Sequence, residues 1–151
     1  MAHLIDNEVF LAFSTYATIV ILKMMLMAPM TGFFRFKNKA FSNQEDLWLA
    51  KNPEEKKKMM RPDDQVERVR RCHQNDLENI IPFIVIGMLY ALTGPDLATA
   101  VLHFRVFVVS RICHTVSYVL VLPQPSRALS WVTGMFATFS MAYKVLSPLH
   151  L

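Results

Sequence analysis

The sequence predicts an all-α membrane protein, a bundle of four transmembrane helices that forms a single domain over residues 1–151. Hydrophobic residues make up 53% of the chain, and the mean hydropathy is positive, at +0.28. A spanning helix needs about 20 mostly apolar residues. Apolar blocks near this length occur in four places, and polar segments separate them. The predicted spans are residues 9–34, 77–92, 97–122 and 128–147.

The first predicted span, VFLAFSTYATIVILKMMLMAPM, carries one lysine, Lys23. A charge at the middle of a membrane costs roughly 2.5 to 3.5 kcal/mol on insertion scales. Lys23 is therefore either a site residue that faces the bundle interior or a residue whose long stem reaches a polar partner or the headgroups. We favour the second interpretation. Arg35, Lys37 and Lys39 mark the polar end of this helix, where cations also suit the helix dipole.

The distribution of charge predicts the orientation in the membrane. Eleven of the sixteen Lys and Arg residues lie between Arg35 and Arg71. Cytosolic segments carry an excess of such residues, so the sequence predicts a cytosolic loop over residues 35–76. Alternation then places both termini and the turn at 93–96 in the lumen, and the turn at 123–127 in the cytosol.

The middle of this loop is polar and contains two X-Pro pairs, Asn52-Pro53 and Arg61-Pro62. Because residues 54–58 show no apolar period, residues 40–64 are predicted to be a mobile loop. A short helix near Asp46 is expected to carry Leu47, Trp48 and Leu49 onto the membrane surface. Asp46 is then either a carboxylate partner for an arginine or a solvated residue at the start of that helix.

The stretch VERVRRCHQNDLENIIPF joins this polar segment to the second span without a turn signal, so it predicts one helix that begins in water and ends in lipid. Pro82 is compatible with this helix, because neighbouring helices can satisfy the carbonyl group that a proline frees in a membrane. At 3.6 residues per turn, four polar residues share one stripe and three others form the adjacent stripe. The first stripe is Arg68, Arg71, Asn75 and Glu78, and the second is Arg70, His73 and Leu77.

The third span carries a polar stripe of Arg111, His114 and Tyr118. Charged groups within membrane helices almost always face the bundle interior, so this stripe is predicted to meet the polar stripe of the second helix. Two interpretations remain open: the stripes form a binding site, or Arg111 pairs with Glu78 to hold the bundle together.

The turn PQPSR precedes the last span and predicts its start. Ser126 is a plausible N-cap, which puts Arg127 at a helix N-terminus, where the dipole and the guanidinium together favour an anion. The last span contains Gly134 and several Ser, Thr and Ala residues, which let membrane helices approach closely.

Composition and motifs exclude several kinds of function. The net charge of +4 does not indicate nucleic-acid binding, because the basic residues lie beside hydrophobic spans in no groove-reading pattern. The five histidines are scattered and have no paired cysteines, so we expect no metal site. Cys72 and Cys113 are the only cysteines and imply no disulfide framework.

The polar residues predict a site for a small zwitterionic ligand with net negative charge. Glutathione has this pattern: its two carboxylates suit arginines, and its ammonium suits a carboxylate such as Glu78. A free thiol has a pKa near 8.5, and a nearby cation can lower such a value by about 1 to 3. Only the thiolate attacks an electrophile. From the residues alone, other small anions fit equally well.

Several long motifs resemble the microsomal glutathione transferases of the MAPEG family. They are VERVRRCHQNDLENIIPF, SRICHTVSY, PQPSRALS, KMMLM, RPDDQVERVRR and LTGPD, and the resemblance covers almost the whole chain. It implies a homotrimer of four-helix subunits in the membrane of the endoplasmic reticulum and in the mitochondrial outer membrane. It also implies that glutathione is the co-substrate, that the active site faces the cytosol, and that the substrates are hydrophobic electrophiles and lipid hydroperoxides.

The resemblance also implies roles for individual residues. Arg127 would be the catalytic residue that stabilises the thiolate. Asp46, Arg111 and His114 come from the spacing of the polar residues and not from the resemblance, and they would only support the site. The glutathione-binding residues would lie between neighbouring subunits, at Arg35, Arg70, Arg71, His73, Asn75, Glu78 and Tyr118.

Two positions depart from the family pattern. Leu47 occupies the position of a reactive cysteine whose modification activates mammalian members, so activation by that route is not expected. Cys72 replaces an alanine beside Arg70, Arg71 and His73. It is either a thiol activated by these cations or a small residue that fills a helix contact, and we favour the second interpretation.

Two alternative functions follow from the same motifs. One is a prostaglandin E synthase-like isomerase of the same family, which the turn PQPSRALS disfavours. The other is a non-catalytic membrane scaffold or lipid-presenting protein, which the intact set of Arg, Asn, Glu and Tyr residues disfavours.

Overall fold

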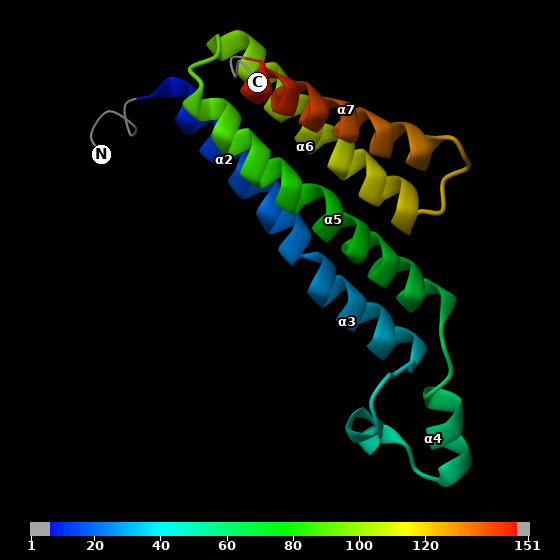
Figure 1. The fold of residues 1–151 in the computed structure, drawn as a ribbon. Helices are drawn as coiled ribbons and strands as arrows, with labels where there is room; N and C mark the ends of the chain where they lie inside the picture. Colours follow the sequence, from blue (N-terminus) through cyan, green and yellow to red (C-terminus); the bar gives the residue numbers. More distant parts are fainter. Residues whose placement is uncertain (1–6, 148–151) are drawn as a thin grey trace.

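The computed structural model describes residues 7–147, and this part of the chain is helical throughout apart from its short connections. Figure 1 shows α2 and α3 running one after the other beside the long helix α5, with α6 and α7 side by side against them. The predicted lumenal termini lie outside the described residues. The elements are α2 (Glu8–Met25), α3 (Met27–Asn38), η1 (Gln44–Leu49), α4 (Pro53–Met59), α5 (Asp64–Leu92), α6 (Leu97–Val119) and α7 (Ser126–Leu146).

The break between α2 and α3 has a local cause. Pro29 has no N–H group to donate to the carbonyl of Met25, four residues earlier, and its ring crowds that carbonyl. The chain nevertheless stays nearly straight, because the amide of Leu26 donates to Leu22 O (3.1 Å) and the amide of Met30 donates to Leu26 O (3.1 Å).

Aromatic side chains from three helices form the main core. The rings of Phe83 on α5 and Phe107 on α6 stack, with centroids 3.8 Å apart. Phe13 on α2 meets Phe104 on α6 edge to face, at 5.5 Å. All four side chains are buried, and such aromatic pairs contribute about 0.5–1.5 kcal/mol beyond the area that they bury. This core holds the apolar halves of the helices together.

Three helical segments among the described residues are long and apolar enough to cross a membrane: Glu8–Asn38, Pro53–Leu92 and Leu97–Val119. The prediction of an all-α membrane protein is therefore confirmed. That α7 also crosses the membrane stays a prediction. It packs closely along α6, where buried Gly134 leaves so little room that an added Cβ would lie 2.7 Å from Ser110 Oγ.

The predicted loop over residues 35–76 is largely helical. The helix α3 continues to Asn38, and the short helix expected near Asp46 is confirmed as η1, whereas the prediction of a loop was wrong at α4. Asn52 caps α4 by accepting a hydrogen bond from the Glu55 amide (2.8 Å), and Pro53 suits the first helical position. The single apolar residue at the end of α4, Met59, is buried against Phe41, so a very short amphipathic pattern was sufficient.

The burial of one side chain and the start of one helix also differ from expectation. Leu47 does not lie on the surface but is buried in the same small cluster as Met59, whereas its neighbour Trp48 is exposed. Ser126 is the first residue of α7 rather than its N-cap, and its hydroxyl donates to Pro123 O (2.7 Å). The helix predicted through Val66 to Phe83 is confirmed, with Pro82 inside it.

Candidate functional site

A pocket of about 540 Å³ lies between α3 and the first turns of α5, within the size range of ligand sites. It brings together four of the residues predicted to bind glutathione. The residues from α5 share one helix face, because they recur at spacings of three and four. The pocket is lined by Ala28, Thr31, Gly32, Arg35, Glu67, Arg70, Arg71, His73, Gln74 and Leu77.

This pocket, which we call the cationic pocket, carries more positive than negative charge. Arg70 Nη1 donates to Glu67 Oε1 (2.7 Å). Arg35 Nη2 donates to Ser42 Oγ (3.3 Å), while its buried Nε has no hydrogen-bond partner within the described part of the chain. Arg71 forms no ion pair with any of residues 7–147. Three guanidinium groups against one carboxylate suit an anionic ligand.

Asn75 and Glu78 lie on the same helix but do not line the pocket. Glu78 is exposed and accepts a hydrogen bond from Gln74 Nε2 (3.1 Å). Asn75 Oδ1 accepts one from Arg111 Nη2 (2.8 Å). The alternative in which Arg111 pairs with Glu78 is not formed, because Arg111 pairs with Asp76 instead.

Asp76 is the centre of an ionic network that joins three helices inside the bundle. Its Oδ1 accepts from Arg111 Nη2 of α6 (2.7 Å), and its Oδ2 accepts from Lys23 Nζ of α2. Asp76 and Arg111 are both fully buried. Lys23 thus reaches a polar partner, which was the favoured interpretation of its charge.

Sequence reasoning missed Asp76 although a signal was present. The buried residues Val69, Cys72, Asp76, Ile80 and Phe83 follow one another at helical spacings of three and four. An acid within such an apolar stripe, in a chain whose spans also carry Lys23 and Arg111, indicates a buried ion pair. The polar stripe of Arg68, Arg71, Asn75 and Glu78 on the same helix is the stronger signal of a binding site.

A third group of predicted residues lies where α6 ends and α7 begins. The rings of His114 and Tyr118 are 5.4 Å apart, and the guanidinium of Arg127 lies 4.7 Å from the centre of the Tyr118 ring. This distance is within the range of cation–π attraction. Arg127 is the second residue of α7, so its charge lies at a helix N-terminus, which confirms that prediction.

The remaining predicted residues have structural contacts. Asp46 Oδ2 lies 3.4 Å from Asn43 Nδ2, and no ion pair to an arginine is formed among residues 7–147. Cys72 is fully buried and its thiol lies 3.7 Å from Thr115 Oγ1. This environment fits the interpretation of Cys72 as a small residue in a helix contact.

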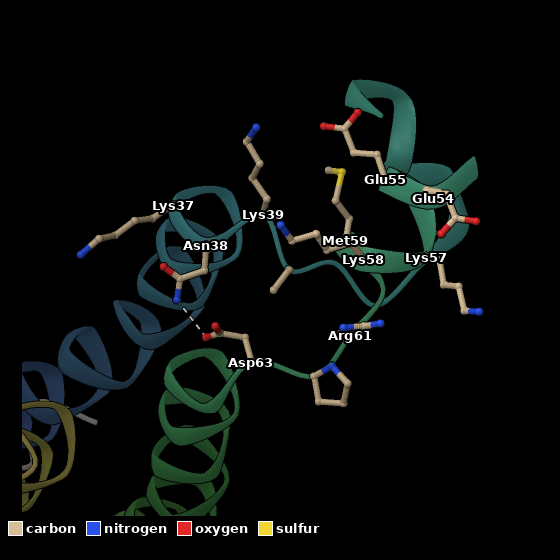
Figure 2. Close-up of a pocket in the computed structure, with 12 residues that line it drawn as sticks. Lys37, Asn38, Lys39, Glu54, Glu55, Lys57, Lys58, Met59, Arg61 and Asp63 are labelled. Carbon is tan, nitrogen blue, oxygen red and sulfur yellow. Dashed lines mark hydrogen bonds between the residues drawn. The ribbon is translucent and has the colours of Figure 1, made fainter. Parts of the chain in front are cut away.

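A larger cavity, of about 740 Å³, lies between the end of α3, α4 and the start of α5. Figure 2 shows its lysines together with Glu54 and Glu55, and the hydrogen bond from Asn38 to Asp63 (2.9 Å) at its floor. It contains none of the predicted site residues, whereas the cationic pocket gathers four of them. The cationic pocket therefore remains the better candidate for an anion site.

The fold and these clusters define a membrane-spanning helical bundle with a cationic pocket at its polar end. A family model described as "MAPEG family" matches residues 13–147. The chain belongs to the MAPEG family, and the resemblance inferred from its motifs is confirmed.

The chain is similar to microsomal glutathione S-transferase 1 of Homo sapiens, with 56% identity over 146 residues, which cover 97% of this chain and 94% of the human protein. The protein of that name from Sus scrofa is 54% identical over the same shares. Prostaglandin E synthase of Homo sapiens is 38% identical over 135 residues, or 89% of this chain and 86% of that protein.

Proposed function

We propose that the chain is a membrane-bound glutathione transferase that conjugates the glutathione thiolate to hydrophobic electrophiles. The observation that carries this proposal is the cationic pocket, which gathers Arg35, Arg70, Arg71 and His73 in a chain 56% identical to human microsomal glutathione S-transferase 1. Glutathione-dependent reduction of lipid hydroperoxides is a second activity that we propose for the same site.

The charges of the site support a division of roles. Arg35, Arg70 and Arg71 bind the two carboxylates of glutathione, which supply the negative charge that the pocket lacks. Glu78 accepts the glutamyl ammonium, and it is exposed and free of ion pairs with residues 7–147. Arg127 faces the sulfur as its proton leaves. The thiolate then attacks the electrophilic carbon, whose leaving group departs with the bonding electrons.

We further propose that three copies of the chain form the active assembly, each with four transmembrane helices. Arg127 and Tyr118 do not line the cationic pocket of their own chain. One ligand can contact the pocket of one subunit together with Arg127 and Tyr118 of a neighbouring subunit most easily if the site lies between subunits. Large apolar side chains such as Phe136 and Phe139 are exposed on α7, which suits contact with lipid or with another copy. Cross-linking of the detergent-solubilised protein tests this assembly, and a monomer would contradict it.

The membrane is that of the endoplasmic reticulum, and the outer mitochondrial membrane as well, with the cationic pocket on the cytosolic side. The cluster of eleven Lys and Arg residues between Arg35 and Arg71 supports this orientation. A cysteine introduced at Lys57 should react with an impermeant reagent in sealed right-side-out microsomes. Protection of that cysteine would place the loop in the lumen and contradict the proposed topology.

A prostaglandin E synthase-like isomerase is the second candidate, because human prostaglandin E synthase is 38% identical to the chain. A non-catalytic membrane scaffold is the third. One assay separates them: the purified protein is mixed with glutathione and an aromatic halide, and thiolate absorbance and product are followed. Thiolate and conjugate support the transferase. Isomerisation of a lipid endoperoxide without conjugation supports the synthase, and glutathione binding with neither product supports the scaffold.

A further inference from the structure

One buried carboxylate has no role in the function proposed above. Asp76 is fully buried, in the part of the bundle where α2, α5 and α6 meet, and both of its oxygens are used. Oδ2 accepts from Lys23 and Oδ1 accepts from Arg111. A buried carboxylate is retained only with such partners, so Asp76 fixes the positions of two cations on two other helices.

The Arg111 nitrogen that contacts Asp76 also contacts two predicted site residues. Nη2 donates to Asn75 Oδ1 (2.8 Å) and lies 3.3 Å from His114 Nδ1. Nη2 carries two hydrogens, and its two shorter contacts, to Asp76 Oδ1 and Asn75 Oδ1, use both of them. One nitrogen therefore orients the Asn75 amide and also lies against the His114 ring.

These contacts continue to the residue proposed to hold the thiolate. The His114 ring lies 5.4 Å from the Tyr118 ring, which in turn lies 4.7 Å from the Arg127 guanidinium. The contacts run from Asp76 through Arg111 and His114 to Tyr118. The only carboxylate that holds Arg111 among the described residues is Asp76, and Arg111 Nε and Nη1 are buried without a hydrogen-bond partner in residues 7–147.

We propose that Asp76 is a positioning residue for the glutathione site: it holds Arg111, and through Arg111 it orients Asn75 and His114. This inference rests on the proposed glutathione transferase function. Asp76 does not touch the ligand. Its loss changes glutathione binding only because Arg111 is no longer held, and the effect on the hydrophobic electrophile is small.

The test removes the charges of the network one or more at a time and checks the fold of each variant, because an unpaired charge inside the bundle disrupts folding. Lys23→Met leaves the Asp76–Arg111 pair intact. Lys23→Met/Asp76→Asn removes one charge of each sign and leaves Arg111 without its carboxylate. Arg111→Met leaves the Lys23–Asp76 pair, and the triple variant removes all three charges. Asp64→Asn, an exposed acid of the same helix, is the matched control.

The expected result separates positioning from general stability. Lys23→Met keeps the KM for glutathione within about twofold of wild type, because Arg111 still has its carboxylate. Asp64→Asn does the same, because it shares no ion pair with the network. Lys23→Met/Asp76→Asn raises this KM about tenfold, the effect of one lost charge-assisted hydrogen bond, while the KM for the electrophile is unchanged. In the Arg111→Met background, the same two substitutions cause no further rise.

The proposal is overturned if Lys23→Met/Asp76→Asn has the glutathione KM of Lys23→Met, or if the two substitutions act equally with and without Arg111. Should that variant not fold, Asp76→Glu keeps the charge and moves it by one methylene; an unchanged glutathione KM in Asp76→Glu also overturns the proposal. Wild-type protein without glutathione turnover would remove the proposed function and this inference together. Turnover in wild type with no effect in the variants removes only the role of Asp76.

Discussion

The ionic network around Asp76 and the cationic pocket use the same residue types in opposite ways. In the network, Asp76 and Arg111 are fully buried and the carboxylate has a cation on each oxygen. In the pocket, the Arg70 side chain is 52% exposed, and Arg70 is the only one of the three arginines that pairs with a carboxylate, that of Glu67, within residues 7–147. Ions that find partners within the chain hold its helices together, and cations without partners are available to a ligand.

The two regions should therefore respond differently to mutation. Removal of one partner from a buried ion pair costs about 3–5 kcal/mol, because the other charge is left uncompensated. An exposed pair contributes only about 0.2–1 kcal/mol. Substitutions in the network should lower stability first, and substitutions in the pocket should lower ligand binding first.

The largest effect is expected for Asp76→Ala, which leaves both Lys23 and Arg111 without a carboxylate. The free energy of unfolding should fall by about 3–5 kcal/mol, as measured by denaturant titration in detergent. Equal stability of Asp76→Ala and wild type would show that the network does not hold the helices.

In the pocket, Arg71→Gln should weaken glutathione binding by about 1.5–3 kcal/mol, the contribution of a hydrogen bond to a charged group. Its stability should be nearly unchanged, because Arg71 is exposed and forms no ion pair within residues 7–147. Isothermal titration calorimetry measures the affinity for glutathione, and scanning calorimetry measures the stability. A loss of stability with unchanged affinity would contradict the assignment of the cationic pocket as the glutathione site.

For Glu78→Gln the expected loss of affinity is of the same kind, at the lower end of about 1.5–3 kcal/mol, because Glu78 is exposed and its replacement keeps the size of the side chain. Unchanged affinity would exclude Glu78 as the partner of the glutathione ammonium. Calorimetry with glutathione and with an analogue that lacks the amino group supplies the control: the variant and wild type should bind the analogue equally.

The smallest overall effect is expected for Glu67→Gln. The pair with Arg70 is partly exposed, so its loss should cost less than about 1 kcal/mol. Glutathione affinity should not decrease, because one negative charge has left the pocket. A fall in affinity would show that Glu67 contributes to the site directly.

Much of the fold followed from the sequence because hydrophobic length and helical period are strong signals. The helix through Val66 to Phe83 was predicted from the spacing of its residues, and the place of Arg127 at the start of a helix was predicted from the two-proline turn before it. In the lobe over residues 40–64 the short helix near Asp46 was predicted, but α4 was not. The helix α4 depends on a cap at Asn52 and on one buried side chain, Met59. Such short elements leave almost no periodic pattern.

The site was predicted less completely than the fold. Arg35, Arg70, Arg71 and His73 gather as the motifs implied, but Asn75 and Tyr118 lie outside that pocket. Helical spacing defines which residues share a face of one helix, and it does not define which faces of different helices meet. The pairing of Asp76 with Lys23 and Arg111 is of this second kind.

The central claim is that cations at the polar end of the bundle bind glutathione and ionise its thiol. The most direct test is the absorbance of the thiolate against pH for wild type and Arg127→Ala, each saturated with glutathione. A full charge beside the forming thiolate acts mainly on its ionisation. Wild type should therefore form thiolate well below the pKa of about 8.5 of a free thiol.

In Arg127→Ala the pKa of the bound thiol should be higher by about 1 to 3, so absorbance and turnover near pH 7 fall while much of the binding remains. Raising the pH should recover part of the turnover, because the thiol then loses its proton without help. If the variant binds glutathione normally and forms thiolate at the same pH as wild type, Arg127 does not activate the thiol and the account is contradicted.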